Sequence, residues 1–513
     1  MASVTFLDVF SAALALYFIK KIYSAESRSP FPPGPKPLPL LGNLLDMPSE
    51  RPWETFAKWG EKYGSWGIVS VHVLGQRVII FNSAEHAINF LEKRSAKSSN
   101  RPHLQLAGEM IGWNKSLVLT QYGNHFKEYR KNIHRTIGTR AALEKFYPLV
   151  ERQVQRFLQR LIHTPEAISN GDATTKVFRL SGALILSISH GYEAQIENDP
   201  YIKTAETAIH YFSTTTVAGA SVVEFLPILK FLPPWFPGAT FHKTALAGKL
   251  ALEEMTDQPH EAVKAEITAG TAKPSFTRAL LEERRLSAEE EFVVKWSAQT
   301  LYSGQNPTVA ALHSFFLAMT LFPEVQRKAQ AEIDAKIGHD RLPSLHDRDE
   351  LPYLNAMNLE LLRWYTLAPL GVAHVTTDDD LYEGYLIPKG SCIFANLWTI
   401  LRDPKTYSDP LEFKPERFIQ TKDKQPDTDP RNVCFGFGRR QCPGMTFAEM
   451  SLFIESAMIL SMFNIKKATE GGNIITPELM QTTGTISFPC PFKCVIEPRS
   501  PKAAELVNRA VES

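Results

Sequence analysis

The sequence predicts a mainly α-helical protein with minor β structure, and three observations support this fold class. Apolar residues recur at helical spacing over much of 148–321, a stretch interrupted by the apolar, proline-broken segment 225–238 (FLPILKFLPPWFPG). β-Branched runs flank a Gly-Gln pair in 67–83 (GIVSVHVLGQRVIIFNS), which predicts a hairpin and a small sheet near the N-terminus. Strand signals return in 482–498 (TTGTISFPCPFKCVIEP), near the C-terminus.

The composition narrows the class of protein. The 513 residues include 56 Lys and Arg against 55 Asp and Glu, and the resulting net charge of +1 argues against binding to nucleic acid. With 44% hydrophobic and 22% charged residues, the chain has the composition of a globular protein with a large core. Its interior has no Gly/Ser-rich linker, which favours a single catalytic body. Five dispersed cysteines indicate a reducing compartment rather than a disulfide scaffold.

The N-terminal segment has the pattern of a membrane anchor. Residues 4–19 (VTFLDVFSAALALYFI) are almost wholly apolar. Their length is marginal for a bilayer span, and Asp8 inside them costs about 2.5–3.5 kcal/mol if it lies near the centre. Lys20 and Lys21 follow the apolar run, whereas a cleaved signal peptide has its positive charge first, so we expect the body to face the cytosol. A buried first helix of the body is the alternative.

A stiff Pro-Pro-Gly-Pro run at 32–35 comes next and typically separates rather than packs. We therefore expect three parts in the chain: an N-terminal membrane anchor at 1–21, a proline-rich hinge at 22–37, and a catalytic domain at 38–513.

The segment with the most chemical information is 435–444, Phe-Gly-Phe-Gly-Arg-Arg-Gln-Cys-Pro-Gly. Cys442 lies where this loop meets an apolar-periodic helix, and backbone N–H groups and the helix dipole lower a thiol pKa at such a position. Gly438 and Gly444 let the backbone approach a large flat group, and Arg440 offers a planar fork for a carboxylate. No histidine or second cysteine has metal-finger spacing, which favours haem over zinc. A structural cysteine in a Gly-rich turn is the alternative.

The same segment matches the motif Phe-x-x-Gly-x-Arg-x-Cys-x-Gly, and the sequence resembles the cytochrome P450 family along nearly its whole length. The resemblance implies the P450 fold, with haem b (iron protoporphyrin IX) between the long oxygen-side helix and the helix after the Cys loop. It implies that Cys442 is the axial thiolate, the ligand of the metal. It also implies that Phe435 packs near the sulfur and that Arg440 pairs with a haem propionate.

A second family motif is Glu360-Leu-Leu-Arg363 on an apolar-periodic helix. On its own, a Glu and an Arg three residues apart form a weak surface ion pair. The downstream Phe-Lys-Pro-Glu-Arg-Phe segment resembles the one that adds a second arginine, here Arg417. The resemblance therefore implies a buried, structural network of Glu360, Arg363 and Arg417 on the haem side of the core.

Two further positions resemble haem-propionate contacts. Segment 122–130 (YGNHFKEYR) is similar to the helix whose Trp-x-x-x-Arg reaches the propionates, but Phe126 replaces the tryptophan. The indole N–H donor is therefore lost, and we expect Arg130 to provide more of the binding to the propionates. His374 lies at a position where fungal relatives often have Pro-His-Arg, and the resemblance implies that it donates a hydrogen bond to a haem propionate. A core or solvated histidine is the alternative there.

The oxygen-side helix departs from its family. The usual Ala/Gly-Gly-x-Asp/Glu-Thr-Thr is replaced in 302–308 by Tyr-Ser-Gly-Gln-Asn-Pro-Thr, so the acid becomes Asn306 and the first threonine becomes Pro307. An amide cannot supply the proton that the acid–alcohol pair passes to oxygen, and proline has neither hydroxyl nor N–H. Proline also removes a helical hydrogen bond, so we expect the helix to kink or open at this turn.

We expect protons to pass instead through Thr308, Ser303 or a hydroxyl on the substrate, with weak coupling of NADPH use to product. Gly304 and Asn306 complete the candidate catalytic segment. The alternative is that the departure marks altered or degraded chemistry.

The regions that line the pocket in the family contain few charges here, which predicts a lipophilic or aromatic small-molecule substrate. By resemblance these regions are 102–118, 209–224, 298–308, 369–375 and 482–488. The apolar segment 225–238 either dips into the bilayer and admits such a substrate or packs on the core as a loop.

The catalytic body leaves no room for a fused flavin reductase, so electrons must come from another protein. The resemblance implies NADPH–cytochrome P450 reductase in the endoplasmic reticulum membrane, with cytochrome b5 as a further candidate. A docking patch on the thiolate side is expected from four basic residues, Lys127, Lys131, Arg431 and Arg439.

The sequence is most similar to fungal members that oxidise secondary metabolites or xenobiotics. An O2-dependent monooxygenase is the main hypothesis. A haem-thiolate isomerase, dehydratase or peroxide-dependent enzyme remains open because of Asn306 and Pro307, and a haem protein without turnover is a third class.

Overall fold

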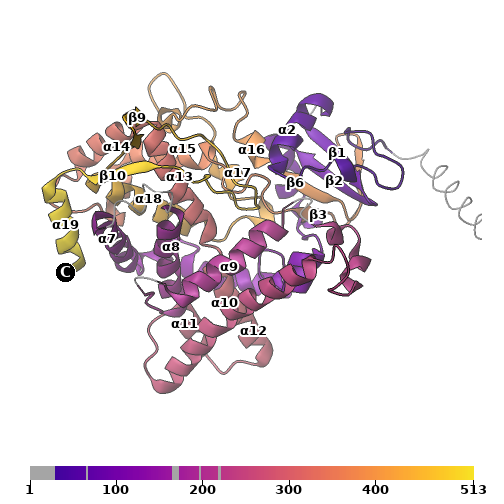
Figure 1. Cartoon of the computed structure of the whole chain (residues 1–513), viewed down its shortest axis with the longest axis horizontal. Coiled ribbons are helices and arrows are strands. Elements are labelled where there is room, and N and C mark those ends of the chain that lie inside the picture. The colour runs from indigo at the N-terminus through magenta and orange to yellow at the C-terminus, as the bar shows by residue number, and fades with distance from the viewer. Residues whose placement is uncertain (1–28, 65–66, 164–172, 196–197, 218–220, 513) are drawn as a thin grey trace, which may run out of the picture.

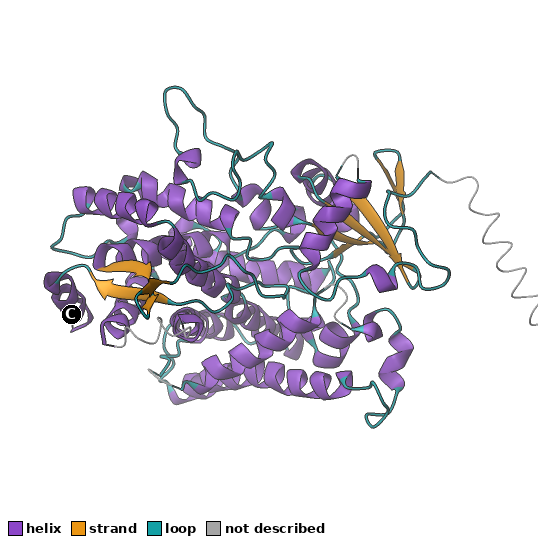
Figure 2. Cartoon of the chain, turned by 45° about the horizontal axis from the view of Figure 1, so that its top comes forward, coloured by secondary structure: helices purple, strands orange, loops and turns teal. Residues whose placement is uncertain are grey.

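The computed structural model describes residues 29–64, 67–163, 173–195, 198–217 and 221–512. The expected anchor at 1–21 and the hinge residues 22–28 lie outside the described residues. Helices dominate the described chain, and short strands gather at two separate places (Figures 1 and 2). The predicted class, mainly α with minor β, is confirmed.

The predicted helical stretch 148–321 is confirmed by α7 to α13, and two 3-10 turns, Val222–Glu224 and Pro227–Phe231, interrupt it. In chain order the helices are α2 (Pro52–Tyr63), α3 (Ala84–Ala87), α4 (Ser95–Ser98), α5 (Asn124–Ile137), α6 (Arg140–Glu144), α7 (Tyr147–His163), α8 (Ala173–His190), α9 (Pro200–Thr215), α10 (Phe241–Ala269), α11 (Phe276–Glu282), α12 (Ala288–Ser303), α13 (Asn306–Leu321), α14 (Pro323–Lys336), α15 (Pro352–Trp364), α16 (Leu397–Ile400), α17 (Arg431–Cys434), α18 (Met445–Met462) and α19 (Pro501–Glu512).

The predicted N-terminal hairpin is confirmed. Strands β1 (Ile68–Val73) and β2 (Gln76–Phe81) pair antiparallel, with Val71 opposite Val78. The turn is Leu74-Gly75 rather than Gly-Gln, because both of these residues take the positive φ angles, 46° and 94°, that a tight hairpin turn needs. The sheet continues from β2 to β6 (Cys392–Ala395) and β3 (His374–Val375).

The remaining strands form two-stranded sheets. The C-terminal strand signals are confirmed in part, since β10 (Cys494–Pro498) pairs with β7 (Phe463–Lys467), whereas 482–488 forms no strand. The other two pairs are β4 (Asp380–Tyr382) with β5 (Tyr385–Ile387), and β8 (Thr469–Glu470) with β9 (Asn473–Ile474).

Part of the expected hinge packs on the sheet. The backbone N–H of Ser70 donates to the Pro33 carbonyl at 2.8 Å, and its hydroxyl donates to the Pro32 carbonyl at 2.6 Å. A Cβ at Gly34 would lie 1.9 Å from the Ser70 carbonyl oxygen, so this close approach requires glycine. The segment 32–34 therefore lies against β1 as part of the folded body.

Helix α18 is the single helix among the described residues that is long and apolar enough to cross a membrane. Since 78% of that stretch is buried, it is a core helix here. It begins three residues after Cys442 and packs against α7, α13, α14 and α15, so the core holds the Cys loop in place.

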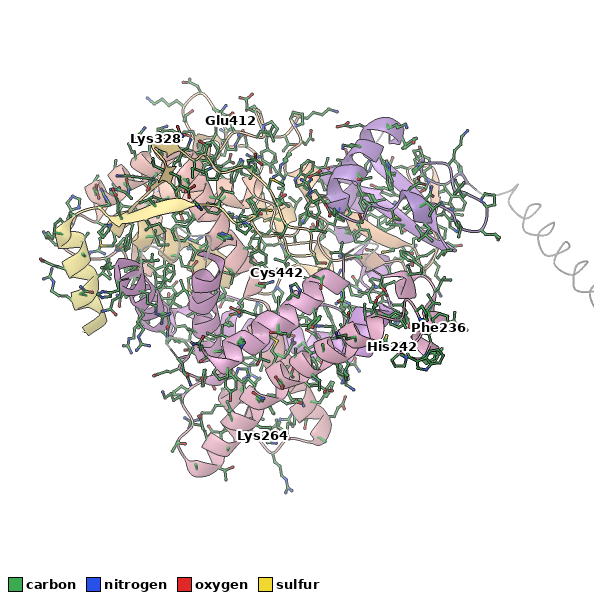
Figure 3. All side chains as sticks on the ribbon, in the orientation of Figure 1. Phe236, His242, Lys264, Lys328, Glu412 and Cys442 are labelled. Carbon is green, nitrogen blue, oxygen red and sulfur yellow. The ribbon has the colours of Figure 1, made fainter. Side chains whose placement is uncertain are left out.

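The segment after α9 forms an exposed apolar loop. Ile228, Phe231 and Trp235 are 74%, 77% and 79% exposed, whereas Phe225 and Leu229 of the same segment pack against the core. The loop therefore lies on the core and turns its other apolar side chains outward. Phe236 of the same loop lies at the right edge of Figure 3, on the side where the described chain begins. Leu40, near that beginning, is also 80% exposed.

Candidate active site

A cavity of 370 Å³ lies in the middle of the molecule, where Figure 3 places Cys442. Its wall comes from the junction of α12 and α13, from α5, from the loop after α15 and from the Cys loop. Each of the five regions expected to line a pocket contributes to it, through residues such as Trp113, Ile209, Leu301, Val372 and Ile486. Most of the lining side chains are aliphatic or aromatic.

The Cys loop presents Cys442 to this cavity, and the residue is exposed there. The backbone N–H of Cys442 donates to the Phe435 carbonyl at 2.7 Å, and Gly436 turns the loop with a φ of 79°. The Gly444 N–H donates to the sulfur. Phe435 lines the same cavity.

The expectation of a lowered thiol pKa is wrong for this structure. Cys442 is exposed only to a cavity in the middle of the molecule, and its distance from bulk water raises the pKa of the thiol, while the Gly444 N–H and the charge of Arg130 oppose that rise. The helix terminus therefore acts as expected, but desolvation of the thiolate is the larger effect.

The two glycines have different roles. A Cβ at Gly438 would lie 2.8 Å from the Leu91 carbonyl oxygen, and the φ angle of Gly438, 51°, is left-handed. Gly438 therefore lets the Cys loop pack against the segment around Leu91 rather than against a cofactor. A Cβ at Gly444 would lie 3.8 Å from the Cys442 sulfur, so this glycine lies beside the thiol itself.

Three arginines line the cavity and bind backbone carbonyls. Arg440 donates to Ser99 at 2.7 Å, Leu117 at 3.2 Å and Thr120 at 2.6 Å. Arg130 donates to Gln441 at 2.6 Å. Arg101 donates to Val118, Val372 and Ala373 at 2.6–3.0 Å.

These arginines form a cluster of uncompensated positive charge. Burial and the nearby Arg130 lower the pKa of Arg440 to about 10, and burial and Arg440 lower that of Arg101. Among the described residues, no carboxylate forms an ion pair with any of the three. A buried cationic cluster of this kind is suited to a ligand with negatively charged groups.

Phe126 and His374 also lie in this cluster. The Phe126 ring centroid is 4.1 Å from the Arg440 guanidinium and 5.8 Å from that of Arg130. The ring therefore makes cation–π contacts with both arginines, although it lacks the N–H of an indole. His374 uses Nδ1–H to donate to the Ser98 carbonyl at 2.7 Å. Burial, then Arg101, holds the pKa of His374 well below its usual range, so the neutral ring offers an acceptor at Nε2, and a donor only when protonated.

The buried network around Glu360 is confirmed. Arg363 donates from Nε and Nη2 to the two carboxylate oxygens of Glu360, both at 2.7 Å, and Arg417 donates from Nε at 3.1 Å. All three side chains are at most 2% exposed. Arg363 also binds the carbonyls of Leu401, Pro410 and Glu412, so the network ties α15 to the segment before the Cys loop.

The predicted opening of the oxygen-side helix is confirmed. Helix α12 ends at Ser303, and α13 begins at Asn306 with Pro307 in its first turn, where proline needs no backbone donor. The Ser303 hydroxyl donates back to the Thr300 carbonyl at 3.3 Å. Thr308, 8% exposed, lines the cavity as Ser303, Gly304 and Asn306 do.

The amides at this break are buried without partners. Gln305 is 3% exposed, and both polar atoms of its side chain have no hydrogen-bond partner among the described residues. Asn306 is 2% exposed, and its Oδ1 is likewise without a partner there. The acid of the family motif is thus replaced by neutral groups that carry no exchangeable acidic proton.

The prediction that Arg431 belongs to a basic docking patch is wrong. Its guanidinium is engaged by Asp429 at 2.5 Å and Glu449 at 3.1 Å, so it is not available as a free surface cation. Arg439 and Lys127 both contact the Tyr122 ring, at 4.9 and 5.6 Å from its centroid, and Lys131 is exposed beside Glu128.

Arg101 is the main cavity residue that the sequence analysis missed. No motif surrounds it, and its one signal is a basic residue between Asn100 and Pro102 in a stretch that folds into the interior. Ile185 of α8 was missed too, since an aliphatic side chain on a buried helix has no distinguishing mark.

Comparison with known proteins agrees with this geometry. The family model described as "Cytochrome P450" matches residues 32–489. "Cytochrome P450 monooxygenase 208" of Postia placenta is 45% identical over 510 residues, which are 99% of this chain and 98% of the relative. "Cytochrome P450 monooxygenase claR" of Ampulloclitocybe clavipes is 45% identical over 508 residues, 98% of this chain and 93% of the relative. "O-methylsterigmatocystin oxidoreductase" of Aspergillus flavus is 36% identical over 509 residues, 98% and 94% of the two chains.

The chain belongs to the cytochrome P450 family, and it is an oxidoreductase of the monooxygenase class. The family implies a haem cofactor, a redox partner and a small-molecule substrate. The residues present fit haem: a thiol faces the cavity, and the uncompensated arginine cluster suits the two propionates.

Proposed function

We propose that this protein is a haem-thiolate monooxygenase that inserts one oxygen atom from O2 into a lipophilic or aromatic small molecule. The observation that carries this proposal is the convergence of Cys442, the arginine cluster and an apolar wall on one 370 Å³ cavity. Bound haem supplies the activation of dioxygen. Cys442 would hold its iron, and Arg440, Arg101 and Arg130 would hold its propionates, while Phe435 and Gly444 lie near the Cys442 sulfur.

Thr308 would be the residue that holds and donates the proton at the cavity wall in this proposal. The Ser303 hydroxyl is committed to the Thr300 carbonyl, whereas no hydrogen bond within the described chain uses the Thr308 hydroxyl. Thr308 therefore holds the group best able to donate into the cavity, with Ser303, Gly304 and Asn306 shaping the break beside it.

The chemical class of the substrate is inferred from the side chains that line the cavity. Glu449 is the one acidic residue among the described lining residues, and it pairs with Arg348 and Arg431 at 3.0 and 3.1 Å. A neutral, lipophilic molecule is favoured in such surroundings. The relative named for O-methylsterigmatocystin supports oxidation of a small organic molecule, and the fungal relatives support a role in secondary metabolism or xenobiotic oxidation.

Electrons come from NADPH through a separate cytochrome P450 reductase, with cytochrome b5 as a second donor. Arg439, Lys127 and Lys131 form the docking patch, near the α5 end of the Cys loop. Charge reversal at Lys127 and Arg439 should slow haem reduction and remove its salt dependence, whereas reversal at Lys466, an exposed lysine on β7, should leave both unchanged. An unchanged rate in the double variant would exclude this patch.

The protein is located at the endoplasmic reticulum membrane with its body in the cytosol. In this proposal residues 1–21 are the anchor, residues 22–28 connect it to the folded body, and the apolar loop around Phe231 and Trp235 is a second contact. Exposure of this loop on the side where the described chain begins supports a single membrane-facing surface.

The test is turnover with reductase, NADPH and isotopically labelled oxygen gas, using lipophilic candidates that displace the iron-bound water in a spectral screen. The proposal requires product that contains one labelled oxygen atom and that fails to form without NADPH.

A second candidate function is a haem-thiolate isomerase, dehydratase or peroxide-dependent enzyme. The buried, neutral Asn306 and the neighbouring Pro307 favour it, since such reactions need no acid–alcohol pair. Conversion of substrate without NADPH, or product without label from O2, would establish this candidate and exclude the first.

A further inference from the structure

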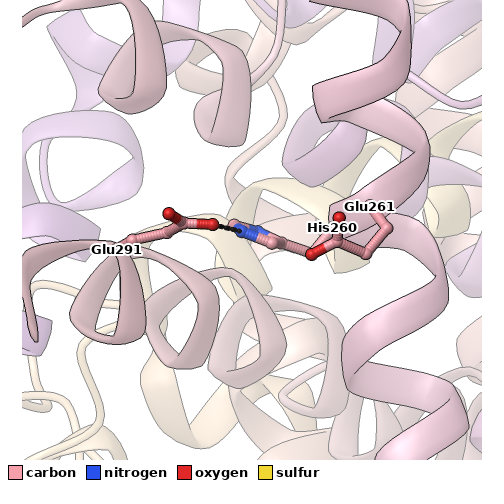
Figure 4. A group of neighbouring side chains, drawn as sticks. All are labelled: His260, Glu261 and Glu291. Carbon is pink, nitrogen blue, oxygen red and sulfur yellow. Dashed lines mark ion pairs between the residues drawn. The ribbon is translucent and has the colours of Figure 1, made fainter. Parts of the chain in front are cut away.

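A buried histidine faces two carboxylates where α10 meets α12, outside the residues that line the cavity. His260 is 1% exposed, and neither of its ring nitrogens has a hydrogen-bond partner among the described residues. Its Nε2 lies 3.5 Å from Oε1 of Glu291. Figure 4 shows the ring of His260 on α10 pointing at the Glu291 carboxylate on α12, with Glu261 next to it in sequence.

The three side chains are close enough to share one ion. One ligand atom from each of His260, Glu261 and Glu291 lies within 4.8 Å of the other two. Burial of an imidazole without a hydrogen bond costs free energy, and the one contact of His260 given above is the long 3.5 Å ion-pair distance to Glu291. A ligand placed between the imidazole and the carboxylates would satisfy both groups.

A lysine ammonium already lies next to the two carboxylates of this cluster. Lys264, one turn after His260, has its ammonium 2.7 Å from Oε1 of Glu291 and 3.4 Å from Oε1 of Glu261. Its side chain is 40% exposed and flexible, so it can turn into solvent when another cation binds. The cluster therefore has the electrostatics of a cation site, with a lysine as its internal occupant.

We propose that His260, Glu261 and Glu291 bind a divalent transition-metal ion, with Zn²⁺ as the best fit, and that Lys264 is displaced on binding. One imidazole and two carboxylates are a ligand set that zinc accepts, with water as the fourth ligand. Ligand atoms around a tetrahedral zinc at about 2.1 Å are roughly 3.4 Å apart.

The 3.5 Å between His260 and Glu291 matches that spacing, and a carboxylate oxygen of Glu261 lies within 4.8 Å of both ligand atoms.

The ion would tie α10 to α12 at a place that is remote from the reaction. Figure 3 shows Lys264 at the lower edge of the molecule and Cys442 at its centre. Lys295 and Asp257 already join the same two helices at 2.8 Å, and the metal would take the place of the link between Lys264 and Glu291. Because α12 ends at Ser303 in the cavity wall, this link fixes the helix that carries part of the active site.

Calorimetric titration of Zn²⁺ into the tag-free, full-length holoenzyme tests the proposal. One ion per chain should bind, and His260→Ala should abolish that binding. Lys264→Met should tighten it about tenfold, because the competing ammonium is gone. The matched control is His125→Ala, which removes an exposed histidine paired with Glu289 of α12 and should leave affinity and stoichiometry unchanged. X-ray absorption at the zinc edge should show one imidazole with oxygen ligands.

Equal binding by the native protein and His260→Ala would overturn the proposal, as would the absence of zinc binding in both the native protein and Lys264→Met. If His260→Ala does not retain haem, Glu291→Gln takes its place, and the same loss of zinc binding is expected. Because these readouts do not depend on turnover, they stand apart from the test of the proposed function.

Discussion

Ser303 and Thr308 line the same cavity from opposite sides of the helix break, yet their hydroxyls are placed differently. The Ser303 hydroxyl donates to the Thr300 carbonyl at 3.3 Å, whereas the Thr308 hydroxyl forms no hydrogen bond with any described residue. The family's acid–alcohol pair is absent, and this difference is the basis on which we propose Thr308, rather than Ser303, as the proton donor.

Thr308→Ala should therefore reduce product formation by roughly 10²-fold, the lower end of what a positioned proton donor contributes. Peroxide released per NADPH should rise in the same variant, because activated oxygen is lost when protonation fails. Ser303→Ala is the matched control and should stay near the native values. Tight coupling of NADPH use to product in the native enzyme and in both variants would contradict this assignment.

Glu360 holds two buried arginines, so its loss leaves both without a counter-charge. We expect Glu360→Gln to destabilise the protein by about 3–5 kcal/mol, as measured by urea unfolding, or to prevent haem retention. Glu128→Gln is the control, because Glu128 and Lys131 have the same spacing but are 51% and 65% exposed. That change should cost at most about 1 kcal/mol. Similar losses in the two variants would show that burial of the network contributes nothing.

Arg101 should hold haem as strongly as Arg440 does, although it lies in no family motif. We expect Arg101→Ala to speed transfer of haem to a scavenging apoprotein by roughly 10–100-fold, because a propionate loses its counter-charge. Arg402→Ala is the comparison, since Arg402 is also buried and donates to the Trp364 carbonyl at 2.8 Å but does not line the cavity. Equal haem loss from both variants would point to general destabilisation instead.

The apolar loop should bind membranes independently of the anchor. In a chain that begins at Ser29, Phe231→Ser with Trp235→Ser should reduce sedimentation with liposomes, because two side chains that are 77% and 79% exposed lose their apolar surface. Ile474→Ser on β9, also 71% exposed, should have no effect. If the double variant binds as well as the parent chain, the loop is not a membrane contact.

Local patterns in the sequence predicted most of the fold. The hairpin, the helical stretch and the opening at Pro307 depend on neighbours in the chain, so alternation, periodicity and proline chemistry were sufficient. The Glu360 network joins residues more than fifty positions apart and was predicted through family resemblance rather than through spacing.

Other features depend on packing and could not be read from local patterns. The raised pKa of Cys442 depends on how deeply the loop is buried, which no motif reports. Arg431 looked like a surface cation, but its pairing with Glu449 of α18 is visible only in three dimensions. Gly438 was predicted to let a cofactor approach, but a glycine is needed at this position because the segment around Leu91 packs closely against it. Arg101 and the unpartnered His260 likewise acquire meaning only from neighbours that are distant in the chain.

The central claim is that the Cys442 sulfur is bound to haem iron as a thiolate. The most direct measurement is the absorbance spectrum of the purified, reduced protein under carbon monoxide, compared with that of Cys442→Ser. We predict the long-wavelength Soret band of thiolate ligation in the native protein and its loss in the variant. A native spectrum without this band, or a variant that keeps it, would contradict the account.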